Sequence, residues 1–218
     1  MKVFIVGIAG QTGFRLAQVL RAHGDEVDGL YRRPEQAEQL AAIGVKATRG
    51  DLAQIDVALL ADHVRGADAI VFAAGAGDTD SEAMIDAIDG DGVVKTIAAA
   101  KLASVQRMLL VSVFPEAGRR EGFGESFEHY IRVKKRADVA LAETDLDWVI
   151  LRPAVLTNRS GTGRISLGPA QIRTKISRDD VAATIAELLQ TPAIKRRILE
   201  LTAGETPITK AVKMQTKV

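Results

Sequence analysis

The sequence predicts a doubly wound α/β fold, a parallel sheet with helices on both faces, completed by a small C-terminal cap. Short apolar runs alternate regularly with longer amphipathic stretches. The runs are apolar throughout, which is typical of strands that are buried on both faces. Strands joined by helices form a parallel sheet with right-handed crossovers. The ligand site of such a sheet lies beyond the carboxyl ends of its strands.

The elements follow one another in a simple order through the first two thirds of the chain. The expected strands are Val3–Val6, Val27–Tyr31, Val45–Thr48, Ala69–Ala73, Met108–Val111 and Trp148–Leu151. The expected helices lie between them, near Phe14–Ala22, Pro34–Ala42, Ile55–Val64, Ser81–Lys101 and Phe127–Glu143.

After Pro153 this alternation stops. The segment 158–175 is rich in Gly, Ser and Arg and is expected to be a loop or an irregular hairpin. Ser177 is a candidate N-cap for the helix that follows it, and a strand near 198–202 and a short helix near 207–214 complete the chain. We therefore expect one domain over residues 1–218, with a nucleotide-binding core of about 1–153 and a substrate-side cap of about 154–218.

Composition restricts the partners. The 218 residues have a formal net charge of +1 and no cysteine. The charge gives no reason to expect nucleic acid or an anionic membrane, and the missing cysteines exclude disulfides and thiol nucleophiles. The histidines and carboxylates show no metal-ligand spacing, so we expect no metal. Without a secretory leader or a long apolar run, the expected location is cytoplasmic.

A glycine-rich turn follows the first expected strand. Gly7, Gly10 and Gly13 are spaced G-x-x-G-x-x-G, where the first ends an apolar run and the third opens a helical pattern. Glycines in this context let the backbone approach a pyrophosphate at a helix N-terminus. Gln11 and Thr12 would face the same anion from the first helical turn. The alternative is a strand-to-helix turn without a ligand.

The end of the second strand indicates which dinucleotide is bound. Asp28 is close to the spacing of an acid that binds the ribose hydroxyls, but it lies inside the expected strand. The strand ends on Arg32 and Arg33, whose guanidinium groups suit a 2′-phosphate. We therefore predict NADP(H), with NAD(H) left open. A solvated pair of arginines at the start of a helix is the alternative.

The motifs together resemble those of the atypical short-chain dehydrogenases/reductases, in particular proteins related to NmrA and to biliverdin reductase B. The matching pieces are "GIAGQTG" at Gly7, "YRR" at Tyr31, "GDL" at Gly50, "VFAAGAG" at Val71, "LLVSV" at Leu109, "LDWVILRP" at Leu146 and "SRDDVA" at Ser177. The resemblance covers nearly the whole chain and implies a Rossmann fold. By resemblance, the residues beside the adenosine are Asp51, Leu52, Ala73, Ala74 and Gly75. Those near the nicotinamide are Pro153, Ala154 and Val155.

The catalytic candidates lie in "YIRVK" and at the end of the fifth strand. Tyr130 and Lys134 are four residues apart and share a helix face, and a nearby ammonium favours the phenolate form of a tyrosine. In the family such a pair exchanges a proton with substrate while the lysine holds the nicotinamide ribose. Ser112 would orient the substrate oxygen. Tyr130 could instead be an aromatic anchor, and Ser112 could cap its strand.

The predicted function is an NADP(H)-dependent oxidoreductase that acts on a small carbonyl, quinone or flavin-like substrate. The alternative is a non-catalytic NAD(P)-sensing module of the NmrA kind, which would bind a protein partner. Val113 and Phe114 replace hydroxyl residues that many relatives carry after Ser112, which favours the sensor. A sugar-nucleotide epimerase or dehydratase is disfavoured because the cap is small. The loop 115–126, with Phe123, is expected to be a lid over the site.

Overall fold

The computed structural model describes residues 1–76, 81–114 and 124–217. The strands are β1 (Lys2–Val6), β2 (Glu26–Tyr31), β3 (Thr48–Arg49), β4 (Ala69–Phe72), β5 (Arg107–Val111), β6 (Asp147–Pro153), β7 (Val155–Thr157), β8 (Arg164–Gly168), β9 (Lys175–Ser177), β10 (Arg197–Ala203) and β11 (Thr206–Pro207). The helices are α1 (Gln11–Ala22), α2 (Gln36–Ala42), α3 (Val57–Val64), α4 (Glu82–Ile85), α5 (Gly92–Leu102), α6 (Glu125–Ala142), α7 (Arg178–Leu189) and α8 (Ile208–Met214). A π-helix, η1 (Asp86–Asp91), joins α4 to α5, and a 3-10 turn, η2 (Gln215–Lys217), follows α8.

The main sheet has nine strands in the order β11-β8-β10-β6-β5-β4-β1-β2-β3. Every neighbouring pair from β3 to β10 is parallel, and β8 runs antiparallel to β10 and β11. The predicted doubly wound α/β fold is confirmed. The chain leaves β1 toward β2 on one side and returns as β4 on the other, so a crevice opens at the carboxyl end of β1.

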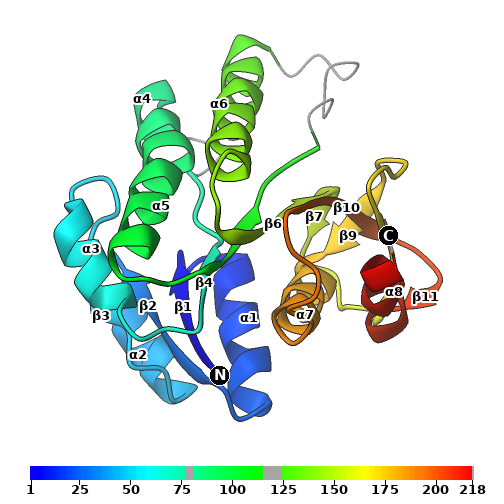
Figure 1. Cartoon of the computed structure of the whole chain (residues 1–218), viewed down its shortest axis with the longest axis horizontal. Coiled ribbons are helices and arrows are strands. Elements are labelled where there is room, and N and C mark those ends of the chain that lie inside the picture. Colours follow the sequence, from blue (N-terminus) through cyan, green and yellow to red (C-terminus); the bar gives the residue numbers. More distant parts are fainter. Residues whose placement is uncertain (77–80, 115–123, 218) are drawn as a thin grey trace.

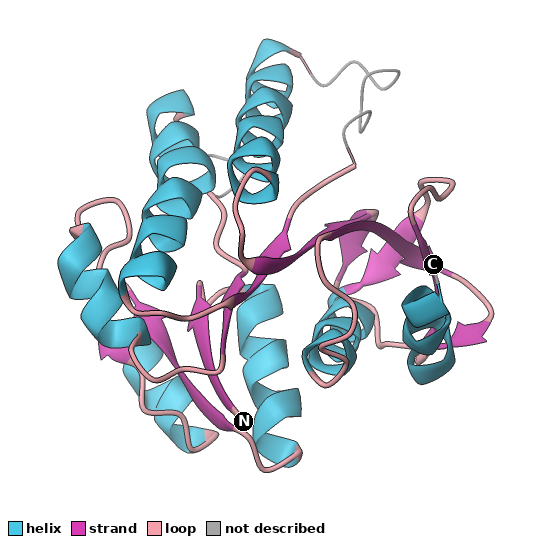
Figure 2. Cartoon of the chain, viewed as in Figure 1, coloured by secondary structure: helices cyan, strands magenta, loops and turns pink. Residues whose placement is uncertain are grey.

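Successive side chains of the central strands point to opposite faces of the sheet and so contribute to two hydrophobic cores, one on each face. In β1, Val3 and Ile5 join the core packed by α1, α2, α7 and α8, while Phe4 and Val6 join the core packed by α3, α5 and α6. The helices accordingly lie on both faces of the sheet (Figures 1 and 2). Strands buried on both faces explain why the apolar runs in the sequence are continuous.

The C-terminal third extends the same sheet. β10 pairs with β6, β8 pairs with β10, and α7 packs against α1. β8 lies inside the segment 158–175, which was expected to be a loop or an irregular hairpin, so its place as a regular strand of the main sheet was not predicted. Its five residues, "RISLG", are too short and too rich in polar and glycine residues to be distinguished from a loop. β7 and β9 form a separate two-stranded parallel sheet.

Two other expected elements differ from the structure. The expected helix 81–101 consists of α4, the π-helix and α5, because a π-helix carries no signature in an apolar pattern. The third strand is short and lies at Thr48–Arg49 rather than at 45–48. Val45 is buried just before it and packs in the α1 core.

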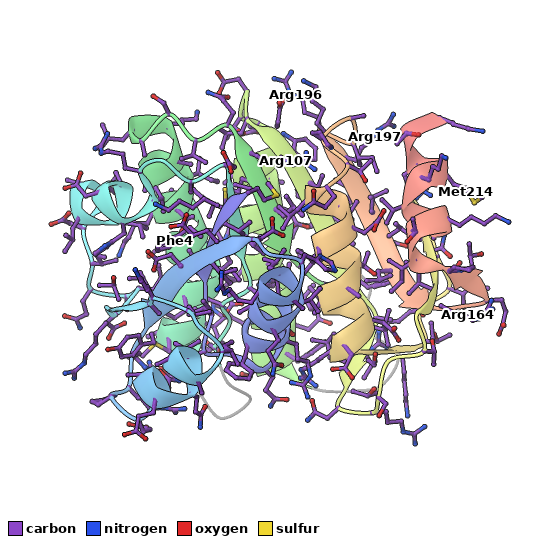
Figure 3. The ribbon with its side chains drawn as sticks, turned by 90° about the horizontal axis from the view of Figure 1, so that it is seen from below. Phe4, Arg107, Arg164, Arg196, Arg197 and Met214 are labelled. Carbon is purple, nitrogen blue, oxygen red and sulfur yellow. The ribbon has the colours of Figure 1, made fainter. Side chains whose placement is uncertain are left out.

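A buried arginine fastens the amino ends of β5 and β6 to the end of α7. Arg107 donates hydrogen bonds to the carbonyl oxygens of Ile194 (2.6 Å), Leu188 (2.9 Å) and Asp147 (3.2 Å). Its side chain is labelled in Figure 3. Burial lowers the pKa of Arg107, and the charge of Asp147 opposes that effect. The guanidinium therefore satisfies carbonyl groups that water cannot reach.

Replacing this arginine should weaken the fold. We expect Arg107→Met to reduce the free energy of unfolding by about 3 kcal/mol, because buried carbonyl oxygens lose their donor. Urea unfolding measures the change. The matched control is Arg132→Met on the exposed face of α6, which should leave the midpoint almost unchanged. Equal midpoints for the two variants would contradict a structural role for Arg107.

Candidate functional site

A pocket of about 490 Å³ lies at the carboxyl ends of the parallel strands, where the topology places a ligand site. The volume is in the range of small-molecule sites. The predicted site residues that line it are Gly7, Gly10, Gln11, Thr12, Arg32, Asp51, Leu52, Ala73, Ala74, Gly75, Ser112, Tyr130 and Lys134. The predicted residues that do not line it are Gly13, Arg33, Pro153, Ala154 and Val155. Residues from nearly the whole length of the chain thus converge on one cavity.

The glycine turn is held by close contacts between backbones. Gly7 has a φ of +88°, and a Cβ there would lie 2.5 Å from the backbone nitrogen of Ala74 in the segment after β4. A Cβ on Gly13 would overlap the carbonyl oxygen of Gly7. The missing Cβ of Gly13 therefore allows the turn to be tight. The missing Cβ of Gly7 allows the end of β1 to lie against the segment after β4, below the pocket.

The residues at this turn fit the pyrophosphate of a dinucleotide. Gly10 is the N-cap of α1, and no side chain of the described residues caps the helix there. The N–H groups of the first turn and the positive end of the helix dipole therefore remain available to an anion. Gly10 itself has room for close approach, since a Cβ there would meet only the carbonyl oxygen of Gly7, at 3.1 Å.

The two arginines after β2 have different surroundings. Arg32 lines the pocket. Arg33 lies 3.1 Å from the Glu35 carboxylate, and both side chains are more than 60% exposed. The side-chain oxygen of Gln36 accepts hydrogen bonds from the backbone N–H groups of Arg32 (3.1 Å) and Arg33 (2.9 Å), which fixes the turn. Asp28 lies in the middle of β2, away from the pocket lining, as the sequence indicated.

A buried ion pair lies at the wall of the pocket beneath the expected nicotinamide end. Lys134 is 3% exposed, donates to the carbonyl oxygen of Val111 (2.9 Å) and lies 3.5 Å from the carboxylate of Asp89. Burial alone would lower the pKa of Lys134, but the charges of Tyr130, Asp89 and Asp138 raise it overall. Lys134 is therefore a permanently charged group, held in one place next to Tyr130 on α6.

Asp89 was not predicted as a site residue. It lies in the π-helix, is itself buried, and accepts a hydrogen bond from the backbone N–H of Ala76 (2.9 Å) with its other oxygen. It thereby links Lys134 to the chain after β4. Asp89 is one of two acids in "AIDGDG", and nothing in that pattern indicates its role, because the pairing depends on the tertiary approach of α6.

A second buried pair lies behind Ser112. Asp138 accepts two hydrogen bonds from the guanidinium of Arg152, at 3.0 and 2.9 Å. Burial raises the pKa of Asp138, and the Ser112 hydroxyl and Arg152 oppose that rise. Ser112 is buried, with its backbone N–H bonded to the carbonyl oxygen of Leu151 (2.7 Å), so it is held between the Asp138 pair and the pocket.

The remaining lining includes residues that the sequence did not indicate, namely Tyr31, Gln36, Asp89, Leu156 and Arg178. Leu156 takes the place expected for its neighbour Val155, because alternation along β7 turns adjacent side chains to opposite faces. Phe127 packs on Tyr130 with ring centroids 5.9 Å apart. Residues 115–123 of the expected lid, including Phe123, lie outside the described residues.

Among residues 1–76, 81–114 and 124–217, no three His, Asp or Glu side chains come together as a metal site. Within the same ranges, none of the helices combines the length and apolar character needed to cross a bilayer.

Comparison with known proteins gives a consistent result. Residues 7–192 match a protein family described as NAD(P)H-binding. The chain is 36% identical over 214 residues to the uncharacterized sugar epimerase YhfK of Bacillus subtilis, covering 98% of this chain and 99% of that protein. The family match confirms the predicted NAD(P)-type cofactor and the resemblance to NAD(P)-binding proteins.

Solved structures show the same fold. A putative NAD-dependent epimerase/dehydratase from Bacillus halodurans is 30% identical with a TM-score of 0.89, covering 98% of this chain and 99% of that one. ChuY, an anaerobilin reductase from Escherichia coli O157:H7, is 26% identical with a TM-score of 0.77, covering 93% of this chain and 97% of that one.

Alanine substitutions should separate the two uses of glycine in the turn. Gly13→Ala should lower the free energy of unfolding by about 2 kcal/mol or more, since its Cβ would overlap backbone. Gly10→Ala should keep the thermal midpoint within a few degrees but weaken NADPH binding, because its Cβ would stand where the cofactor approaches. Thermal unfolding and calorimetric titration measure the two effects. A Gly13→Ala protein as stable as the original would contradict the packing argument.

Proposed function

The chain belongs to the family of NAD(P)H-binding proteins, and we propose that it is an NADP(H)-dependent oxidoreductase acting on a small carbonyl, quinone or flavin-like substrate. The observation that carries this proposal is the pair Tyr130 and Lys134, which lines the same pocket as the glycine turn. A protein that only binds the dinucleotide would need the glycine turn but would not need this tyrosine and lysine pair. A phenol beside a buried, charged ammonium is an arrangement suited to proton transfer.

The cofactor-holding residues are proposed from their places around the pocket. The glycine turn and first turn of α1 would hold the pyrophosphate, with Asp51, Leu52 and Ala73 to Gly75 beside the adenosine. Arg32 would bind the 2′-phosphate that distinguishes NADP(H). When bound, the nicotinamide supplies or accepts a hydride.

Tyr130 would exchange the accompanying proton through its phenolic oxygen. A nearby ammonium favours the phenolate over the neutral phenol, which suits this tyrosine to exchange a proton with the substrate oxygen. Asp89 and the Val111 carbonyl hold the ammonium in place. In the wider family the lysine also binds the nicotinamide ribose, and Lys134 lines the pocket from which it could do so.

Ser112 would orient the substrate oxygen toward Tyr130. Ser112 is buried, and its hydroxyl interacts with the Asp138 carboxylate behind it. A hydroxyl fixed in advance stabilises developing charge on an oxygen without reorganisation during the reaction. Leu156 and Phe127 add apolar surface next to this end of the pocket, which favours a substrate with an apolar body.

The comparisons support reductase chemistry without naming a substrate. ChuY is a reductase, whereas YhfK and the B. halodurans protein carry epimerase in their names. An epimerase would also use a dinucleotide and a tyrosine. The C-terminal third of this chain, however, mainly extends the sheet and adds only a small cap, which disfavours a nucleotide-sugar substrate. If the protein is instead an NmrA-like sensor, it should bind the cofactor tightly and show no turnover.

The tyrosine tests the catalytic proposal. Tyr130→Phe should lower NADPH consumption with a panel of quinones, flavins and aldehydes by about 100-fold or more, the usual contribution of a positioned acid–base group. The Kd for NADPH should stay within about twofold. The control is Tyr31→Phe, which changes the other tyrosine of the pocket away from the ammonium. Undiminished turnover in Tyr130→Phe would refute the mechanism, and NADPH binding with no turnover across the panel would favour the sensor.

The two arginines test the choice of cofactor. Arg32→Gln should raise the Kd for NADPH about tenfold or more and leave that for NADH almost unchanged, because only NADPH carries the 2′-phosphate. Arg33→Gln should have a smaller effect, since that side chain faces solvent and Glu35. Side-by-side calorimetric titrations at one ionic strength give these values. Equal affinity of the original protein for NADPH and NADH would overturn the phosphate assignment.

A further inference from the structure

Gln36 lines the pocket together with Arg32, and neither the glycine turn nor the proposed chemistry gives it a role. It is the first residue of α2, at the end of the turn that follows β2, and it is half-buried. The proposed function assigns this end of the pocket to the adenosine and its 2′-phosphate. The contacts of Gln36 therefore bear on which nucleotide the pocket accepts.

The side-chain amide of Gln36 is held in one orientation. Its oxygen accepts hydrogen bonds from the backbone N–H groups of Arg32 (3.1 Å) and Arg33 (2.9 Å). The backbone N–H of Gln36 donates to the carbonyl oxygen of Arg33 (3.0 Å). Both partners of the side chain are donors, so the amide oxygen faces them and the amide nitrogen cannot take its place. One residue thus closes the turn and fixes the direction of its own amide.

The NH2 group of this amide carries two donors that are available to a ligand. Within residues 1–76, 81–114 and 124–217, no acceptor bonds to it. Because the nitrogen and the oxygen are bonded to the same carbon atom, the NH2 group lies close to the backbone of Arg32, whose residue also lines the pocket. A donor that is fixed in advance binds an acceptor with little further loss of conformational freedom.

The charged side chains of this turn favour an anion in the pocket. Arg33 and Glu35 lie 3.1 Å apart and are both exposed, so their charges offset each other in solvent. Arg32 is the cation of the turn that lines the pocket. Asp51 lines it from the segment after β3, where its carboxylate accepts from the backbone N–H of Ala53 (3.0 Å). The turn after β2 therefore presents a guanidinium and an amide to the ligand, and no carboxylate.

The groups that this turn offers are donors. The one acceptor of the Gln36 amide is already occupied by two backbone N–H groups. A phosphate dianion has only acceptors, and hydrogen bonds to a charged acceptor are about twice as strong as neutral ones. We propose that Gln36 donates from its side-chain amide to the 2′-phosphate of NADP(H), and that it determines with Arg32 which nucleotide is preferred. The proposal rests on the proposed function, which places the adenosine at this end.

Gln36→Glu tests the donor while preserving the turn. The carboxylate keeps an oxygen for the two backbone N–H groups, but it has no N–H of its own and repels a phosphate. The Kd for NADPH should rise about tenfold or more, which corresponds to about 1.4 kcal/mol. The Kd for NADH should stay within about twofold or fall, since a carboxylate accepts from ribose hydroxyls. Side-by-side calorimetric titrations at one ionic strength give both constants.

Two fragments isolate the contribution of the phosphate. Adenosine 2′,5′-bisphosphate and adenosine 5′-monophosphate differ only in the 2′-phosphate. Gln36→Glu should weaken binding of the first about tenfold and leave that of the second within about twofold. If both fragments weaken equally, Gln36 only holds the turn and the proposal is overturned. An unchanged Kd for NADPH in this variant overturns it as well.

Controls separate recognition from charge and folding. Gln39→Glu adds the same charge at an exposed position of α2 outside the pocket lining and should change either Kd by less than about twofold. If it weakens NADPH as much as Gln36→Glu does, the effect is long-range electrostatics and the proposal is overturned. Gln36→Met removes the donors without adding a charge and should still weaken NADPH more than NADH. Thermal midpoints within a few degrees of the original show that the variants are folded.

The role of Gln36 and the oxidoreductase function fail in different ways, because the Kd values need no turnover. Suppose that the original protein prefers NADPH, that Gln36→Glu loses this preference, and that no quinone, flavin or aldehyde is reduced. That result would support the proposal and refute the oxidoreductase. Turnover with either nucleotide, together with equal Kd values for both in the original protein, would keep the oxidoreductase and overturn the proposal.

Discussion

The structure depends on one steric constraint, the close approach of three backbone segments at the end of β1. Gly7 lies against the backbone of Ala74 after β4, and Gly13 lies against the carbonyl group of Gly7. No side chain fits between them. Because of this contact, β1 and β4 can be neighbours while α1 begins directly above the crevice. The same contact that closes the fold therefore leaves the N-terminus of α1 without a side-chain cap, at the place where we propose that the cofactor binds.

A second constraint comes from two charged side chains that are buried at the pocket wall. Lys134 and Asp89 are both almost fully buried, and an isolated charge in such a place is very costly. Each therefore needs the other, and Asp89 reaches the site from a π-helix, an irregularity often found at functional sites. The arrangement links α6, the π-helix and the chain after β4. A buried ammonium held by two fixed partners is suited to tuning a neighbouring phenol and poorly suited to moving.

Sequence reasoning succeeded where a local pattern determines the outcome. Continuous apolar runs identified the parallel strands, and the glycine spacing with its strand-to-helix context identified the turn. It failed where the outcome depends on tertiary approach. Asp89, Leu156 and Arg178 have no pattern that marks them, and β8 is too short to be distinguished from a loop. The distinction between Arg32 and Arg33 depends on the tertiary fold only for Arg32, which lines the pocket, because Glu35, the partner of Arg33, is two residues away in the sequence.

The C-terminal third of the chain shows how a single sheet can carry both parts of the proposed cofactor and substrate site. β10 and β8 continue the sheet beyond β6, so this part of the chain has the same rigid base as the glycine turn. β7 and α7 then return toward the crevice, and the Arg15–Asp179 bond joins α7 to α1. Because the wall that bears Leu156 and Arg178 is built on the same base as the cofactor cradle, a substrate bound against this wall would meet the dinucleotide in one fixed orientation. The proposed hydride transfer requires such a fixed orientation of substrate and cofactor, which would arise here from sheet pairing and one ion pair rather than from a separate domain.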